Sequence, residues 1–124
     1  MNKEQPLILL VDDNKTNLYI GINAMEGKYN VSTAPSAHKM FYLLENNRPD
    51  LILLDIDMPE MCGYDAIKTL KSKPETKDIP VIFLTSRTKP DEELKGLTLG
   101  AIDYIVKPYD PRVLMKRIEI RLAN

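Results

Sequence analysis

Short, continuously apolar runs alternate with amphipathic segments along this chain. Three runs are apolar at every position: residues 7–11, 51–54 and 81–84. Runs this short, without polar alternation, are typical of strands that are buried on both faces, as in a parallel sheet. Two weaker strands are predicted over residues 30–34 and 102–106.

Helical patterns separate the predicted strands. Apolar residues recur at helical spacing in five segments, which are marked by Leu18, Ile22 and Met25; Ala37, Met40, Phe41 and Leu44; Ile67 and Leu70; Leu94 and Leu97; and Leu114, Ile118 and Leu122. Five strands alternating with five helices predict an α/β fold with helices on both faces of a parallel sheet. In such a fold the functional site lies at the carboxyl ends of the strands.

Polar side chains follow four of the predicted strands. Asp12 and Asp13 follow the first strand, Asp55 the third, Thr85 the fourth and Lys107 the fifth. Because the carboxyl ends of parallel strands meet at one edge, we expect three carboxylates, a hydroxyl and an amine to converge there. Closely packed carboxylates repel one another, and a hard divalent cation such as Mg²⁺ would relieve that repulsion.

These groups suit phosphoryl transfer, which needs charge neutralisation and positioning more than covalent chemistry from the protein. The Lys107 ammonium, the Thr85 hydroxyl and Mg²⁺ would neutralise the phosphoryl oxygens, and Asp55 would be the nucleophile. Each residue also has an ordinary structural explanation; residues 12–14, for example, could be only a turn and a helix cap. Their occurrence at four separate strand ends favours the functional interpretation.

Four segments resemble the receiver domains of two-component response regulators: residues 11–14, residues 54–59 followed by Gly63, residues 84–86 and residues 100–108. The resemblance covers residues 7–122. It implies a flavodoxin-like, doubly wound sheet of five parallel strands in the order 2-1-3-4-5, with five helices. It also implies that residues 1–124 form a single receiver domain.

The resemblance implies that Asp55 accepts the phosphoryl group. It further implies an Mg²⁺ ion held by Asp12, Asp13, Asp55 and the main-chain carbonyl of Asp57, with one of the first two aspartates acting through water. Cys62 stands where receivers commonly have an aspartate before the glycine, and we expect it to be a loop or helix-start residue without a role in the chemistry.

A switch is implied by the same resemblance. Thr85 and Lys107 would contact the phosphoryl group, and Tyr104 would swing inward as Thr85 moves. We expect a cis peptide bond between Lys107 and Pro108, because the lysine must turn back toward the phosphoryl group as the chain leaves the sheet.

Asp57 and Arg87 are predicted to tune the lifetime of the phosphorylated state. Asp57 lies two residues after Asp55, and Arg87 lies two residues after Thr85. In the expected fold both side chains flank the mouth of the site, where their opposite charges could pair and screen the path of an attacking water.

Composition restricts the classes of partner. The 124 residues carry a net charge of −1, from 17 basic and 18 acidic residues, which gives no electrostatic case for direct binding of nucleic acid or of an anionic membrane. The single cysteine, Cys62, cannot form an internal disulfide, so a reducing compartment, the cytoplasm, is expected. No apolar run approaches the roughly 18 residues of a membrane span.

The expected partners follow from the resemblance. A sensor histidine kinase or a phosphotransfer protein would supply the phosphoryl group, and an output domain or downstream protein would respond to it, with a phosphorylation-dependent dimer as a further expectation. The domain would then be a regulatory phosphoacceptor rather than an enzyme. Residues 13–18 and 107–111 are similar to those of receivers attached to cyclic-dinucleotide enzymes or hybrid kinases.

Three alternatives compete with this interpretation. A flavodoxin-like cofactor binder would carry a Gly-rich or Ser/Thr-rich loop after the first strand, where this chain has carboxylates. A pseudo-receiver that serves only protein interaction usually lacks one of the five site residues, and all five are here. An aspartyl phosphatase of similar topology would place its nucleophile after the first strand rather than the third.

Overall fold

The sheet has the predicted topology. In the computed structural model, which describes residues 5–86 and 90–123, five parallel strands follow the order β2-β1-β3-β4-β5. Their bounds are β1 Leu7–Val11, β2 Asn30–Ala34, β3 Leu51–Asp55, β4 Val81–Thr85 and β5 Asp103–Val106. The predicted order 2-1-3-4-5 is therefore confirmed.

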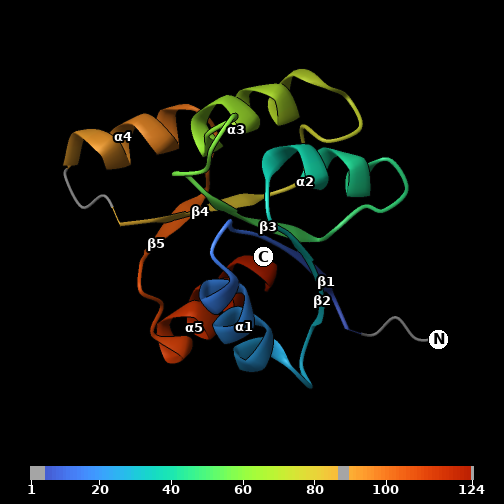
Figure 1. Cartoon of the computed structure of the whole chain (residues 1–124), viewed down its shortest axis with the longest axis vertical. Coiled ribbons are helices and arrows are strands. Elements are labelled where there is room, and N and C mark those ends of the chain that lie inside the picture. Colours follow the sequence, from blue (N-terminus) through green and yellow to red (C-terminus); the bar gives the residue numbers. More distant parts are fainter. Residues whose placement is uncertain (1–4, 87–89, 124) are drawn as a thin grey trace.

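Helices cover both faces of this sheet. Their bounds are α1 Lys15–Met25, α2 Ala37–Leu44, α3 Gly63–Ser72, α4 Pro90–Thr98 and α5 Pro111–Leu122. In Figure 1, α2, α3 and α4 lie on one side of the sheet, and α1 and α5 lie on the other. Among residues 5–86 and 90–123, no helix is both long and apolar enough to cross a membrane.

The apolar runs are explained by two cores, one on each face of the sheet. Alternate residues of β1, β3 and β4 point to opposite faces. Leu9, Ile52 and Phe83 join the core beneath α2 and α3, which also contains Met40 and Ile67. The intervening strand residues join the core beneath α1 and α5, namely Ile8, Leu10, Leu51, Leu53, Ile82 and Leu84. Because both faces are covered, these strands show no polar alternation.

Helix α1 presents a different face to the sheet than its apolar spacing predicts. Met25 is fully buried, but Ile22 is 39% exposed. Gly21 takes the inner position instead, and a Cβ there would lie 2.5 Å from Cδ2 of Leu10. The expectation that Ile22 shares the buried face is therefore wrong. The Leu10 side chain fills the space beneath α1, so the helix turns the side-chain-free Gly21 toward it and Ile22 toward solvent.

Helix α4 also packs through a glycine. Leu94 and Leu97 are 61% and 41% exposed, whereas Gly96 is buried, and a Cβ there would lie 2.9 Å from the Phe83 ring. A polar contact ties the helix to α3, because the Tyr64 hydroxyl donates to Oε1 of Glu92 at 2.7 Å. The apolar residues that predicted this helix are therefore its exposed ones.

Strand register brings the polar ends together. Val11 is paired with Leu54, so Asp12 and Asp55 end neighbouring strands. On the other side, Asp55 is paired with Leu84 in β4. The main-chain N–H of Lys107 donates to the carbonyl of Thr85 at 2.8 Å. Four strand ends therefore meet at one edge of the sheet, as the sequence predicts.

Candidate functional site

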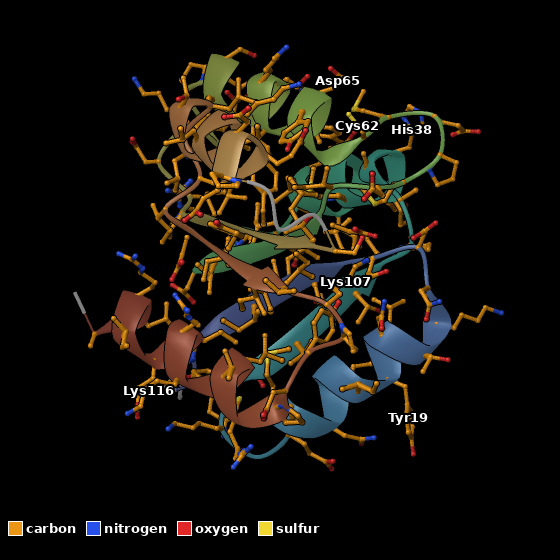
Figure 2. All side chains as sticks on the ribbon, turned by 90° about the vertical axis from the view of Figure 1, so that its left-hand side faces the viewer. Tyr19, His38, Cys62, Asp65, Lys107 and Lys116 are labelled. Atoms are coloured by element: carbon orange, nitrogen blue, oxygen red, sulfur yellow. The ribbon has the colours of Figure 1, made fainter. Side chains whose placement is uncertain are left out.

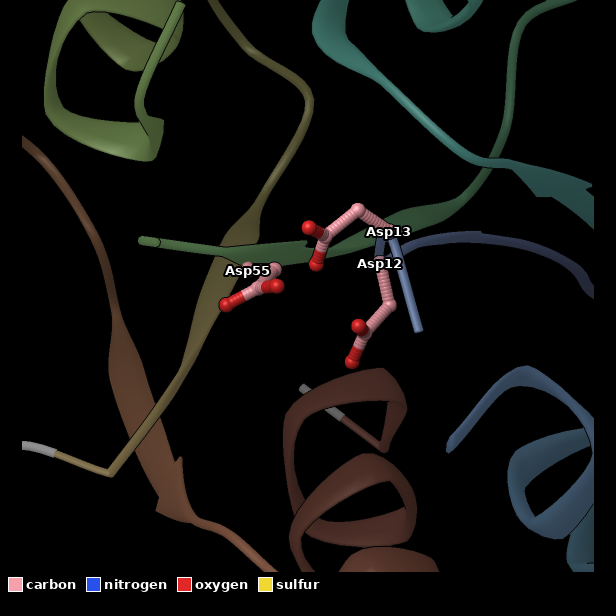
Figure 3. Close-up of side chains that lie close together, drawn as sticks. All are labelled: Asp12, Asp13 and Asp55. Atoms are coloured by element: carbon pink, nitrogen blue, oxygen red, sulfur yellow. The ribbon is translucent and has the colours of Figure 1, made fainter. Parts of the chain in front are cut away.

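Three carboxylates gather at this edge of the sheet. Asp12, Asp13 and Asp55 each offer an oxygen, and these oxygens lie within 4.8 Å of one another (Figure 3). Asp12 and Asp55 are 0% exposed, while Asp13 is exposed. The cluster is thus built into the fold on one side and open to solvent on the other.

Both carboxylate oxygens of Asp12 already accept hydrogen bonds. Its Oδ1 accepts from the main-chain N–H of Asn14 at 2.9 Å, and its Oδ2 accepts from the Tyr109 hydroxyl at 2.5 Å. Lys107 Nζ lies 3.6 Å from the same Oδ2. Asn14 is also the N-cap of α1, where its side chain accepts from the N–H of Asn17. The start of α1 therefore fixes one side of this carboxylate.

Asp55 is only half satisfied. Its Oδ1 accepts from Lys107 Nζ at 3.0 Å and from the N–H of Asp57 at 3.1 Å. Its Oδ2 is buried and has no hydrogen-bond partner within residues 5–86 and 90–123. Burial is the main reason why the pKa of Asp55 is raised to about 7; the hydrogen bond from Lys107 lowers this pKa, and the charge of Asp12 raises it further.

Lys107 reaches the carboxylates from the chain that follows β5. Its bond to Pro108 is cis, as predicted. Burial lowers the pKa of Lys107, but the hydrogen bonds and charges of Asp55 and Asp12 outweigh it and raise this pKa above its ordinary value. The side chain is thus held as an ammonium. Figure 2 shows Lys107 at the middle of the molecule, whereas Tyr19 on α1 and Lys116 on α5 project outward from the layer that these two helices form.

The residues present fit a hard divalent cation. Three carboxylates face a single ammonium, and a buried oxygen of Asp55 lacks a partner among the described residues. Oxygen-only donor sets of this kind suit Mg²⁺, which also keeps several waters. Asp13 and Asp55 have oxygens to offer directly, whereas both oxygens of Asp12 are engaged with the protein.

Thr85 and Tyr104 border one small cavity. Thr85 ends β4 and is 2% exposed, and Tyr104 in β5 is half-buried beside Phe83. Both line a small cavity between the sheet and α4, whose lining includes the apolar Ile56 and Phe83 and the acidic Glu92, Glu93 and Asp103. The two predicted switch residues therefore share one space, which a change at either could alter.

Other predicted residues lie at the margin of the site or outside it. Asp57 is exposed on the loop after β3. Arg87 lies outside the described residues, so its pairing with Asp57 stays a prediction. His38, the single histidine of the chain, is exposed, with Nε2 3.5 Å from Oε1 of Glu60. Cys62 directly precedes α3, in agreement with its expected place at a helix start. In Figure 2, the side chains of His38 and Cys62 both lie on the α2–α3 side of the sheet.

Tyr109 is the site residue that sequence reasoning missed. Its hydroxyl meets Asp12, although the two residues are 97 positions apart. One signal could have found it: a polar aromatic residue directly after the Lys-Pro pair, at a strand end where other polar groups converge.

Comparison with known proteins gives the family. The family model described as "Response regulator receiver domain" matches residues 8–119. The chain is 40% identical over 120 residues to a Vibrio cholerae protein named "Probable cyclic di-GMP phosphodiesterase", a match that covers 97% of this chain and 27% of that protein. It is 41% identical over 118 residues to response regulator SaeR of Staphylococcus aureus, with 94% and 50% covered. The chain thus spans half or less of the length of these curated relatives.

A solved structure extends the likeness to the fold. The crystal structure of a putative response regulator from Chloroflexus aurantiacus matches with a TM-score of 0.91 and 30% sequence identity, over 98% of this chain and 100% of that one. Because the family model and this neighbour both span nearly the whole chain, the chain belongs to the response regulator receiver domain family.

Proposed function

We propose that this chain is a phosphoacceptor switch in which Asp55 receives a phosphoryl group with the help of Mg²⁺. The observation that carries the proposal is the state of Asp55. One of its oxygens is held by Lys107 and by a main-chain N–H, and the other is buried without a partner among the described residues. A carboxylate with a partnerless oxygen beside a cation and two further carboxylates suits both metal binding and attack on phosphorus.

The transfer forms one bond and breaks one. A carboxylate oxygen of Asp55 bonds to phosphorus while the bond from phosphorus to the donor breaks, and the donor keeps the bonding electron pair. The donor is the phosphohistidine of a sensor kinase or phosphotransfer protein, or a small phosphodonor such as acetyl phosphate. Bound Mg²⁺ would be held by Asp13, Asp55 and the main-chain carbonyl of Asp57, with Asp12 acting through water, and would supply charge neutralisation. The Lys107 ammonium, which donates to Asp55 in the resting structure, would then donate to a new phosphoryl oxygen instead.

Phosphorylation would change the surface of the domain through movements of the Thr85 and Tyr104 side chains. Thr85 would move toward the new phosphoryl oxygens, and the half-buried Tyr104 ring would follow into the space that Thr85 leaves beside the small cavity that both residues line. This movement changes the surface over β5 and α4 that a downstream partner would contact. The unphosphorylated protein should visit this state already, because phosphorylation shifts a population between two states.

We propose the classes of protein with which this domain works. We infer a cytoplasmic domain, residues 1–124, that couples a histidine kinase or phosphotransfer protein to an output domain or downstream protein, with a phosphorylation-dependent dimer as a further prediction. The relative named as a probable cyclic di-GMP phosphodiesterase supports a link to cyclic-dinucleotide turnover. That relative is longer than this chain, so the link concerns the kind of protein in which such a receiver works.

Intact-mass analysis after incubation with acetyl phosphate and Mg²⁺ tests the function. The wild type should gain one phosphoryl group, and Asp55→Asn should gain none. Asp65→Asn, which changes an exposed carboxylate on α3, is the matched control and should be labelled like the wild type. Equal labelling of Asp55→Asn would contradict the assignment. Steady hydrolysis of a small phosphate ester would instead favour the phosphatase alternative.

A further inference from the structure

We propose that Tyr109 is a positioning residue for the metal: its hydroxyl holds the Asp12 carboxylate in the orientation that Mg²⁺ binding requires. This inference rests on the proposed function, since it assumes that the acidic cluster takes Mg²⁺. Tyr109 itself has no part in the proposed phosphoryl transfer and would act only through Asp12.

The tyrosine ring is fixed by the core. Tyr109 is 5% exposed and belongs to the apolar cluster under α1 and α5, together with Leu10, Ile105 and Leu114. Its hydroxyl emerges from this cluster and donates to Oδ2 of Asp12 at 2.5 Å. A ring packed in this way cannot swing without disturbing the core, so the hydroxyl is a donor with a fixed position.

Asp12 depends on that donor. Its carboxylate is 0% exposed, so water does not replace a lost hydrogen bond easily. The N–H of Asn14 holds Oδ1, and Tyr109 holds Oδ2. Two fixed donors on two oxygens set the plane of the carboxylate. With a donor already on each oxygen, Asp12 would act on a bound cation through a water molecule, and Asp13 and Asp55 would make the direct contacts.

The same hydroxyl keeps Lys107 on Asp55. Lys107 Nζ lies 3.0 Å from Oδ1 of Asp55 but 3.6 Å from Oδ2 of Asp12. Without the tyrosine hydroxyl, Oδ2 of Asp12 would be a buried acceptor whose nearest donor is this ammonium. The ammonium would move toward Asp12 and the carboxylate would turn to meet it. Mg²⁺ would then have to displace this closer ion pair before it could bind.

Tyr109→Phe tests the inference, because it removes one oxygen and leaves the ring in the core. Tyr29→Phe is the matched control, since Tyr29 is 7% exposed in the same apolar cluster. Main-chain amide shifts of Asp13 and Asp57, followed by NMR during a titration with Mg²⁺, report binding directly. Removing an outer-shell donor weakens metal binding by about 10- to 100-fold in other sites, so we expect Tyr109→Phe to weaken it about tenfold and Tyr29→Phe to leave it unchanged.

A second measurement separates positioning from damage to the fold. At saturating Mg²⁺, the rate of phosphorylation by acetyl phosphate should return to within about threefold of wild type in Tyr109→Phe, since the metal reorders the carboxylate once it is bound. A rate that stays low at all Mg²⁺ concentrations would overturn the inference, because it would show general disruption.

The remaining outcomes distinguish the two proposals. If the wild type binds Mg²⁺ and Tyr109→Phe binds it within twofold as well, the positioning role is wrong and the proposed function stands. The positioning role is also wrong if Tyr29→Phe loses as much affinity. If the wild type shows no Mg²⁺-dependent shifts, both proposals fail together.

Discussion

Asp55 should weaken the fold at neutral pH, because it is a buried carboxylate. Its side chain is 0% exposed, and burial is the main cause that raises its pKa from 3.8 to about 7. Between these values the folded state holds a proton that the unfolded state has already lost. The free energy of unfolding therefore falls as pH rises from about 4 to about 7. Asp55→Asn removes the ionisable group and should remove this loss.

Linkage gives the size of the effect. A pKa difference of one corresponds to about 1.36 kcal/mol. Without Mg²⁺, Asp55→Asn should be more stable than the wild type by about 2 kcal/mol at pH 5 and by about 4 kcal/mol at pH 8. If Mg²⁺ binds as proposed, it should reduce the difference at pH 8, because it would stabilise the folded wild type and would have one ligand fewer in the variant.

Urea unfolding followed by far-UV circular dichroism, with a chelator present and at several pH values, measures this difference. Glu45→Gln is the control: Glu45 is exposed at the end of α2, and the change should alter the free energy of unfolding by at most about 0.5 kcal/mol. If Asp55→Asn is no more stable than the wild type at pH 8 without metal, burial does not destabilise this carboxylate and the reasoning is refuted.

Two further substitutions test the packing around the site. Gly63→Ala would place a Cβ 2.5 Å from the main-chain oxygen of Asp55 and 2.8 Å from Cα of Ile56, so urea unfolding should show a loss of about 1–3 kcal/mol; unchanged stability would contradict the close approach. Tyr64→Phe removes the hydroxyl that donates to Glu92. Amide exchange in α4 should become about two- to tenfold faster, as expected for one lost hydrogen bond, while Tyr42→Phe, at a residue 62% exposed, should not change it.

The sheet and its polar edge were predictable because their causes are local. Each central strand is buried on both faces, so its residues are apolar without interruption, and the first polar residue marks the strand end. Asp12 and Asp55 are such residues, and parallel pairing of their strands brings them together. Lys107 follows the partly buried edge strand β5 and reaches both carboxylates from there. The fold prediction therefore needed only the order of the runs and the family resemblance.

The inner faces of the helices depend on distant neighbours and were harder to predict. Ile22 has the spacing of a core residue but is half-exposed, since Leu10 fills the space beneath Gly21. Periodicity records where apolar residues recur, but it does not show how much space the opposite element leaves. Tyr109 was missed because its contact also depends on a distant neighbour: its hydroxyl meets Asp12, which lies near the other end of the chain.

The hydrogen bonds at the site are distributed unequally, and this inequality indicates where reaction can occur. Asp12 has a donor on each oxygen, so the fold has fixed it and little remains for it to gain. Asp55 has two donors on one oxygen and no partner within the described residues on the other. A buried oxygen without a partner is unfavourable, by about 1–3 kcal/mol in comparable cases, and either a metal ion or a bond to phosphorus would relieve it. The fold therefore destabilises Asp55 while it stabilises the neighbouring Asp12, and this difference is why we propose Asp55, the group left unsatisfied, as the one that reacts.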